Sequence, residues 1–260
     1  MRRRWTWFAD HADRLDPQTL GRLRGAARVL RRQLDRLIRT ADFRLSMPIA
    51  GSEATSADRA SGIDWRWRPA VWQGALEQSG AARSAGGAAV ASGSQICEAV
   101  TLFHDCPLAE IAYRQLRNPA AVFADPRGGA PFALAIEVFG FRGSFLSLAL
   151  DLPPQAAEGL RRKHVIRLDT VIEAERPVSI LARLNIRHGP NVEQVGGQVT
   201  GSGADGLGAD SSMIEFDLAY SEIHEERVEQ MWIDLFVQAP QMNCITLRDM
   251  ALCRRPRAAL

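Results

Sequence analysis

The chain has 260 residues, 46% of them apolar, and a formal net charge of +2 at neutral pH. That length fits one large domain, or one domain with an extension, and the apolar fraction allows a buried core. A net charge this close to zero argues against nucleic-acid binding through the chain as a whole. No stretch approaches the roughly 18 apolar residues that a membrane-spanning helix needs, so no transmembrane segment is predicted.

The N-terminal segment, residues 1–8, is basic and aromatic and lacks the apolar run of a secretory signal. We therefore expect a cytoplasmic protein, with peripheral membrane contact as an open alternative because Trp and Arg suit the depth of lipid headgroups. The four cysteines have no C-x-x-C spacing. In that compartment we expect reduced thiols that fill space like small apolar side chains.

The first predicted element is a helix that begins at Asp16-Pro17 and runs to about Phe43. Asp is a favoured N-cap and Pro a favoured first-turn residue, whereas Pro48 prevents continuation. Leu and Ala recur at alternating steps of three and four, which predicts an apolar stripe along one side. The stripe consists of Leu20, Leu23, Ala27, Leu30, Leu34, Leu37 and Ala41. The other faces are basic and carry Arg22, Arg24, Arg28, Arg31, Arg32, Arg36 and Arg39.

Three interpretations of this amphipathic helix remain open. Its stripe can pack on the rest of the protein, or residues 17–43 can self-associate as a coiled coil. In the third interpretation the helix contacts an anionic partner such as a membrane surface. The arginines assigned to that contact are Arg24, Arg28, Arg31, Arg32 and Arg36. The predicted domain plan is a basic helix over 1–45, a linker over 46–62, a β domain over 63–255 and a tail over 256–260.

From residue 63 onward, short apolar–polar alternations indicate strands that are buried on one face. The predicted strands are Ile96–Phe103, Glu110–Arg117, Phe132–Phe139, Ser144–Leu152, His164–Ala174, Val178–Arg187, Met213–Tyr220, Met231–Gln238 and Ile245–Cys253. Gly, Pro, Asn and Asp fill the connections, and the Gly-rich stretches 78–94 and 196–212 are predicted to be loops. This spacing predicts an antiparallel β-sandwich of jelly-roll type, preceded by the helix.

The alternation also sorts side chains onto two faces of each strand. Opposite the apolar positions lie Arg183, Asn185, Asp217, Trp232 and Asp234. If their strands are neighbours, these residues share one exposed polar face, with His188 and Asn191 of the following turn at its rim. A salt-bridge ladder that keeps the sheet soluble explains such a face without any ligand. The alternative is a site for a glycan or polyol, since Arg, Asn and carboxylates offer planar hydrogen-bonding groups and Trp232 offers a stacking surface.

The sequence contains no catalytic or cofactor motif that we recognise. There is no G-x-S-x-G, and the Gly-rich stretches lack the Lys-Ser/Thr of a phosphate-binding loop. His188 with Glu193, and His224 with Glu225 and Glu226, have no recognised ligand spacing, so no transition-metal site is predicted. A structural Ca²⁺ would suit a jelly roll, but the sequence assigns no ligands to it. We expect binding without catalysis, or alternatively a cytoplasmic scaffold that acts through the N-terminal helix.

Several segments resemble an uncharacterised alphaproteobacterial family, a domain of unknown function. They are Leu30–Ile38, Gly143–Leu148, Leu184–Asn191 with Glu193-Gln194, Glu215–Ser221 and Arg254–Arg257. This resemblance implies a shared fold and a bacterial source, and it carries over no activity. A polar sheet face with an aromatic residue is also similar in architecture to jelly-roll carbohydrate-binding modules, which implies a glycan partner on that face.

Overall fold

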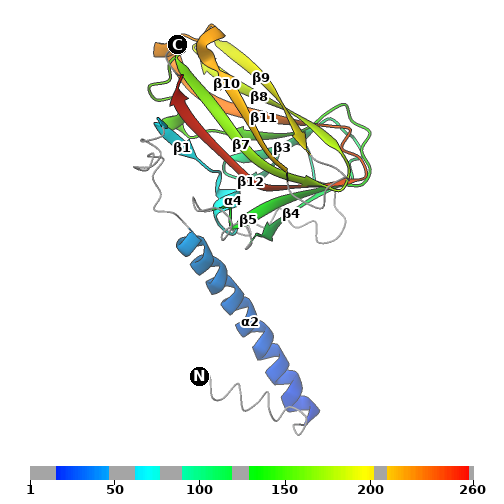
Figure 1. The fold of residues 1–260 in the computed structure, drawn as a ribbon. Helices are drawn as coiled ribbons and strands as arrows, with labels where there is room; N and C mark the ends of the chain where they lie inside the picture. The colour runs from blue at the N-terminus through cyan, green and yellow to red at the C-terminus, as the bar shows by residue number, and fades with distance from the viewer. Residues whose placement is uncertain (1–15, 47–61, 77–89, 119–128, 202–209, 258–260) are drawn as a thin grey trace. The chain divides into compact units, whose positions relative to one another are not determined.

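The structure is a computed structural model of the chain, and it describes residues 16–46, 62–76, 90–118, 129–201 and 210–257. The chain divides into two compact units, Met1–Leu45 and Ser46–Leu260. The first unit carries one long helix and the second carries the β-strands (Figure 1).

Helix α2 (Pro17–Ser46) has the start that the sequence predicts. The Asp16 carboxylate accepts hydrogen bonds from the backbone N–H of Gln18 at 3.1 Å and of Thr19 at 2.9 Å. These bonds satisfy donors that the first turn leaves without intrahelical partners. The helix continues to Ser46, beyond the predicted end at Phe43. In the described chain, no helix is both long enough and apolar enough to cross a membrane.

The second unit is an antiparallel sandwich of two sheets, which confirms the predicted fold class. Sheet A has the order β10-β7-β12-β5-β4, with β1 also paired to β12. Its strands are β1 (Trp65–Trp67), β4 (Ile111–Arg117), β5 (Phe132–Val138), β7 (His164–Ala174), β10 (Asp210–Asp217) and β12 (Asn243–Pro256). Sheet B has the order β2-β3-β6-β11-β8-β9. Its strands are β2 (Ser94–Cys97), β3 (Val100–His104), β6 (Leu146–Asp151), β8 (Val178–His188), β9 (Asn191–Gly201) and β11 (Val228–Gln238). Figure 1 shows β7, β12 and β5 in one layer, with β8 and β11 in the other.

The core lies between the two sheets and is filled by alternate residues of each strand. Trp72, in the short helix α4 (Ala70–Gln73), is fully buried, and its indole N–H donates to the carbonyl of Leu247 at 2.9 Å. The Gln115 amide of β4 donates to the carbonyls of Val71 and Gly74, both at 2.7 Å. These bonds hold the α4 segment against sheet A, and the indole ring of Trp72 therefore covers one part of the core.

The cysteines add no crosslinks to this core. All four are free thiols, and Cys106 and Cys253 are buried. Burial raises the pKa of Cys97, Cys244 and Cys253 above the ordinary thiol value. These three side chains are therefore protonated at neutral pH and behave as small apolar groups.

Three strand predictions need correction. The single strand predicted over Ile96–Phe103 is a hairpin, β2 and β3, because a turn at residues 98–99 reverses the chain. The predicted strand Met213–Tyr220 starts earlier, at Asp210, and ends at Asp217, whose carboxylate accepts from the Ala219 N–H at 3.0 Å and begins a 3₁₀ turn. Part of the predicted loop 196–212 is strand, in β9 and β10. Most of the other predicted loop, 78–94, lies outside the described residues.

Candidate binding face on the outer side of sheet B

Four of the predicted polar-face residues meet on the outer side of sheet B, which we call the binding face. Strands β8 and β11 pair antiparallel, with Arg183 opposite Asp234 and Asn185 opposite Trp232. Because side chains alternate along a strand, all four point away from the core. The intervening residues of both strands, such as Leu184 and Ile233, are fully buried between the sheets.

Asn185 organises the polar groups of this face. Its side chain is only 1% exposed, although it belongs to the outer side of the sheet. Its amide donates to Oδ2 of Asp234 at 2.9 Å and to the Arg183 carbonyl at 3.2 Å, and its Oδ1 accepts from Nε2 of Gln194 at 3.1 Å. A buried amide with all these bonds fixes the orientation of the side chains around it.

Arg183 is held by the same network and still reaches solvent. Its Nη2 donates to Oδ2 of Asp234 at 3.0 Å, and the guanidinium lies 4.7 Å from the ring centre of Phe236. The Arg183 side chain is 39% exposed and that of Asp234 is 13% exposed. The carboxylate and the ring therefore position the guanidinium, and part of it stays accessible to a ligand.

The strand register arranges the binding face in three rows that cross the strands. The aromatic row is Phe103, Ser147, Phe236, Leu181 and Gln198. The polar row is Thr101, Ala149, Asp234, Arg183 and Gly196, and the Trp232 row is Asp151, Trp232, Asn185 and Gln194. The polar row therefore lies between two rows that carry aromatic rings.

The two rings of the aromatic row are separated by one strand. Phe103 is 40% exposed, Phe236 is half-buried, and Ser147 between them is buried. Adjacent strands are about 4.8 Å apart, so the two phenylalanines lie roughly 10 Å apart across the sheet. This separation is close to the length of a disaccharide.

Asp217 does not belong to this face, contrary to the prediction. It is the last residue of β10, which pairs with β7 in sheet A, whereas Arg183 and Trp232 are in sheet B. Its carboxylate starts the 3₁₀ turn and lies 3.4 Å from Nη1 of Arg257. Alternation within a strand tells which side a residue takes, but it carries no information on which sheet the strand joins.

The outer side of sheet A carries ion pairs, the arrangement that the sequence analysis gave as the explanation of a polar face without a ligand. Arg167 pairs with Asp169 at 2.6 Å, and Arg255 pairs with Glu215 at 2.9 Å. The first pair lies within β7, and the second joins β12 to β10 across the intervening β7. The two sheets therefore differ, with charge pairs on sheet A, whereas sheet B combines the ion pairs Arg183–Asp234 and Arg187–Glu229 with amides and aromatic rings.

The predicted rim residues also need correction. His188 is 3% exposed and belongs to the inward-facing side of β8, where its ring meets the edge of His224 at 5.4 Å. It points away from the polar row because it is an odd number of residues from Arg183 and Asn185. Asn191 is exposed at the start of β9, next to the tight turn at Gly189, where φ is +61°. Neither residue joins the hydrogen-bond network of Asn185.

Sequence reasoning missed Phe103 and Phe236 as site residues. Phe236 alternates with Asp234 and Trp232, so the same pattern that found those two contains it. Phe103 faces the site only because β3 pairs with β6, a contact between distant segments that no local pattern reveals. On α2, Arg24, Arg28 and Arg31 are exposed, whereas the side chains of Arg32 and Arg36 lie outside what the structure describes.

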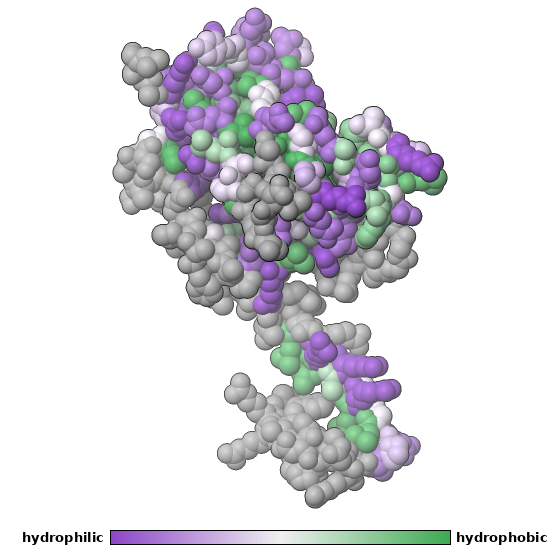
Figure 2. Space-filling view, turned by 45° about the vertical axis from the view of Figure 1, so that its right-hand side comes forward, coloured by the Kyte–Doolittle hydropathy of each residue, from purple (hydrophilic) through white to green (hydrophobic). Residues whose placement is uncertain are grey.

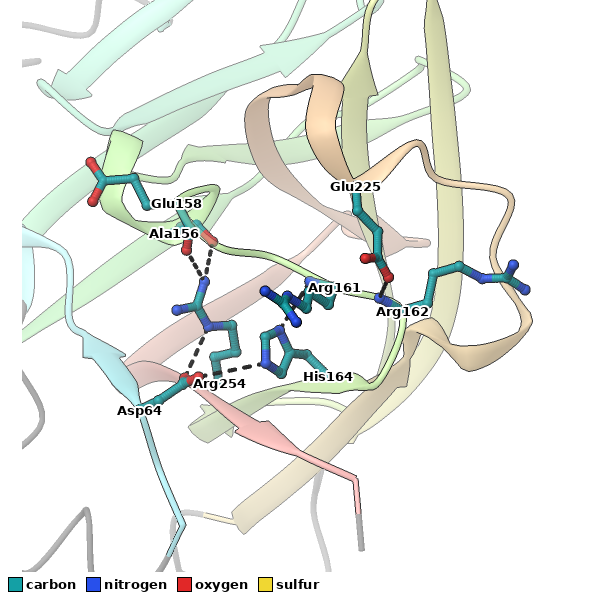
Figure 3. A network of polar contacts seen from close by, with 8 residues as sticks. All are labelled: Asp64, Ala156, Glu158, Arg161, Arg162, His164, Glu225 and Arg254. Atoms are coloured by element: carbon teal, nitrogen blue, oxygen red, sulfur yellow. Dashed lines mark hydrogen bonds and ion pairs between the residues drawn. The ribbon is translucent and has the colours of Figure 1, made fainter. Parts of the chain in front are cut away.

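A second polar cluster surrounds Arg254 at the end of β12 (Figure 3). The Arg254 side chain is buried, with Nε donating to Asp64 at 2.9 Å and Nη1 donating to the carbonyls of Ala156 and Glu158 at 3.1 and 2.7 Å. His164 accepts from the Arg161 N–H at 3.1 Å, and burial lowers the pKa of His164 although Asp64 lies 3.6 Å away. Each of these groups is engaged within the protein, so the cluster joins segments of the fold.

Metal-ligating side chains do not gather in the part of the chain that the structure describes. No group of three His, Cys, Asp or Glu side chains there is placed to hold an ion. The two candidate sets singled out in the sequence, His188 with Glu193 and His224 with Glu225 and Glu226, are not placed to hold an ion.

Solved structures with a similar architecture include binding modules and an enzyme. A family 11 carbohydrate-binding module from Clostridium thermocellum, solved with a mixed-linked tetrasaccharide, is 11% identical, with a TM-score of 0.39 over 62% of this chain and 92% of that chain. A putative sugar binding protein from Bacteroides thetaiotaomicron is 12% identical, with a TM-score of 0.38 over 59% of this chain and 87% of its own. A Stig cyclase from Fischerella is 10% identical, with a TM-score of 0.36 over 58% of this chain and 77% of its own.

Similarities this weak carry no argument about what the chain binds, and function has to be argued from its own residues. No protein of curated function matches the chain in sequence. One sequence family does match, over residues 1–260. The chain therefore belongs to DUF6478, a family of unknown function.

Proposed function

We propose that the protein is a non-catalytic binding module that holds a glycan on the binding face of sheet B. One observation carries this proposal. Asn185 is buried within an outward-facing network that holds Asp234 and Gln194 in fixed orientations beside an accessible Arg183 and three aromatic rings. A ladder of ion pairs for solubility requires neither the buried amide nor the rings.

The chemistry of the face suits a sugar. Sugar hydroxyls both donate and accept hydrogen bonds, and the polar row offers guanidinium donors from Arg183 and carboxylate lone pairs from Asp234. The apolar faces of pyranose rings stack on aromatic side chains, which Trp232, Phe103 and Phe236 supply. Because Asp234 balances the charge of Arg183, the site suits a neutral glycan better than a strongly anionic one.

The arrangement also suits an extended chain. The rows cross the strands, and Phe103 and Phe236 are separated by about the length of a disaccharide, roughly 10 Å from the strand spacing. A linear glycan lying across β3, β6, β11 and β8 would meet both rings and the Arg183–Asp234 pair. The fixed side chains lower the entropy cost of binding, because they are ordered before the ligand arrives.

The test is a glycan array followed by titration calorimetry on the best ligand. The variants are Trp232→Ala, Phe103→Ala and Arg183→Lys, where lysine keeps the charge and loses the forked hydrogen bonding. The matched controls are Phe139→Ala, an exposed ring outside the face, and Arg167→Lys, an ion-paired arginine of sheet A. We expect each site variant to weaken binding tenfold or more and both controls to bind like the wild-type protein.

Two results would contradict the proposal. The first is a correctly folded wild-type protein that binds no glycan on the array. The second is a ligand whose affinity falls equally for site and control variants. Thermal melts of every variant separate lost binding from lost folding, and Phe103→Ala is the most informative here because that ring is already 40% exposed.

A further inference from the structure

We propose that α2 docks on the surface of an anionic lipid bilayer, with its Leu side in the headgroup boundary and its arginines on the lipid phosphates. This inference is independent of the glycan proposal, since it concerns the other unit of the chain. It rests on the exposure of the apolar stripe and on the charges around that stripe.

The apolar side of α2 is accessible in the part that the structure describes. Of the leucines in the stripe, Leu34 is 47% exposed, while Leu20, Leu23 and Leu30 are half-buried. Figure 2 shows hydrophobic and hydrophilic residues side by side on the described part of this helix. The described part of the first unit is this helix alone. No second element described in that unit covers the stripe.

The charge of α2 has one sign over most of its length. Residues 17–34 contain five arginines and no acidic residue. At 100° per residue, Arg24 and Arg31 border the leucine stripe on one side and Arg22 approaches it from the other. Low overall hydrophobicity, a clear apolar stripe and a strongly basic remaining surface are typical of helices that lie in the membrane interface.

A second copy of the chain is the less favourable occupant. In a coiled coil, the positions beside the apolar seam face their counterparts on the partner helix, and here these positions include Arg24 and Arg31. In an antiparallel pair these arginines face each other and repel, and in a parallel pair they face Ala26 and Gln33, which offer no opposite charge. Lipid phosphates attract each of them. A basic residue near an anionic membrane strengthens binding by roughly fivefold. A guanidinium also matches phosphate oxygens with two parallel hydrogen bonds.

The proposal is tested with the full chain and lipid vesicles in a flotation or sedimentation assay. We expect binding to vesicles of phosphatidylcholine with phosphatidylglycerol and little binding to phosphatidylcholine alone. Binding should fall steeply when NaCl rises from about 0.05 to 0.5 M, because screening shortens the range of the attraction. The charge variant is Arg24→Glu with Arg28→Glu, and the apolar variant is Leu23→Gln with Leu30→Gln, which keeps good helix formers.

Both α2 variants should reduce vesicle binding more than tenfold. The matched control, Lys163→Glu with Arg176→Glu, makes the same charge change at exposed positions of the second unit and should bind like the wild-type protein. Wild-type protein that does not bind the anionic vesicles overturns the proposal. So does full binding by the apolar variant alongside lost binding by the charge variant, which would show that the arginines contact anionic charge without the leucine side entering the headgroup boundary. A dimer in analytical ultracentrifugation that Leu23→Gln with Leu30→Gln dissociates, without vesicle binding, would identify a second copy as the occupant.

Discussion

Asn185 and Arg254 are polar side chains that the sandwich buries almost completely. Burying such groups is costly unless their hydrogen bonds are made, so each occurs where the surrounding backbone and side chains supply partners. The two differ in what surrounds them. Asn185 supports side chains that face solvent, which suits a binding surface, whereas Arg254 is enclosed by Asp64 and two backbone carbonyls. One therefore positions a site and the other holds segments of the fold together.

At the scale of single residues, we predict that Arg254→Met destabilises the protein by about 1–3 kcal/mol, because it leaves the buried Ala156 carbonyl and the partly buried Glu158 carbonyl without their donor. Urea unfolding followed by circular dichroism measures the change. The matched control is Arg255→Met, its neighbour in β12, whose side chain is 34% exposed where that of Arg254 is 10% exposed. Surface ion pairs contribute about 0–1 kcal/mol, so Arg255→Met should unfold nearly like the wild-type protein. Equal losses for the two variants would show that Arg254 makes no special contribution.

At the scale of the elements, the sequence predicted long alternating strands well and Gly-rich strands poorly. Strand β7 was predicted with the bounds His164–Ala174 that the structure has, because its alternation is unbroken over the whole strand. Strand β9 was missed, because its three glycines interrupt the apolar–polar alternation and have low strand propensity. β9 is a strand because its backbone pairs with β8, whose own residues alternate clearly between the two faces of the sheet.

The prediction of the candidate site was partly correct, and clear alternation within strands again explains the correct part. Arg183, Asn185, Trp232 and Asp234 were placed together correctly because β8 and β11 each alternate clearly and are neighbours in one sheet. Asp217 and Phe103 were misplaced or missed because their positions depend on which strands pair, a property of distant segments. The local periodicity of a sequence predicts on which side of its strand a residue lies, whereas the pairing of strands decides which residues come together in the site.

The two adjacent glycines of β9 provide a test of its register. A methyl group at Gly197 would come within 2.5 Å of Cγ2 of Ile214, whereas the space beside Gly196 is open. We therefore predict that Gly197→Ala destabilises the protein by about 1–3 kcal/mol through overpacking. Gly196→Ala, on the outer side, should be neutral or stabilising by up to about 1 kcal/mol, since it restricts the unfolded chain. Thermal melts compare the two, and a reversed order would mean that β9 is shifted by one residue.

At the scale of the whole molecule, the chain combines a basic helix in one unit with a β-sandwich in the other. The buried apolar residues of the described chain run from Trp65 to Cys253. The two proposals assign separate tasks to the two units, lipid contact to the first and glycan binding to the second. A molecule built this way would hold a glycan-binding face near a membrane, and each task could be removed without the other.

Deleting residues 1–46 tests that separation. Because the buried apolar residues that the structure describes all lie between Trp65 and Cys253, we predict that the melting temperature of the truncated protein stays within about 2 °C of the full chain, given that 1 kcal/mol shifts it by about 2–4 °C at this size. Glycan binding should be retained, and binding to anionic vesicles should be lost. A melting temperature lower by more than about 5 °C would mean that the leucine stripe of α2 packs on the sandwich, because apolar surface would then be exposed by the deletion. Vesicle binding that survives the deletion would place the lipid contact on the sandwich, and the arginines of α2 would need another explanation.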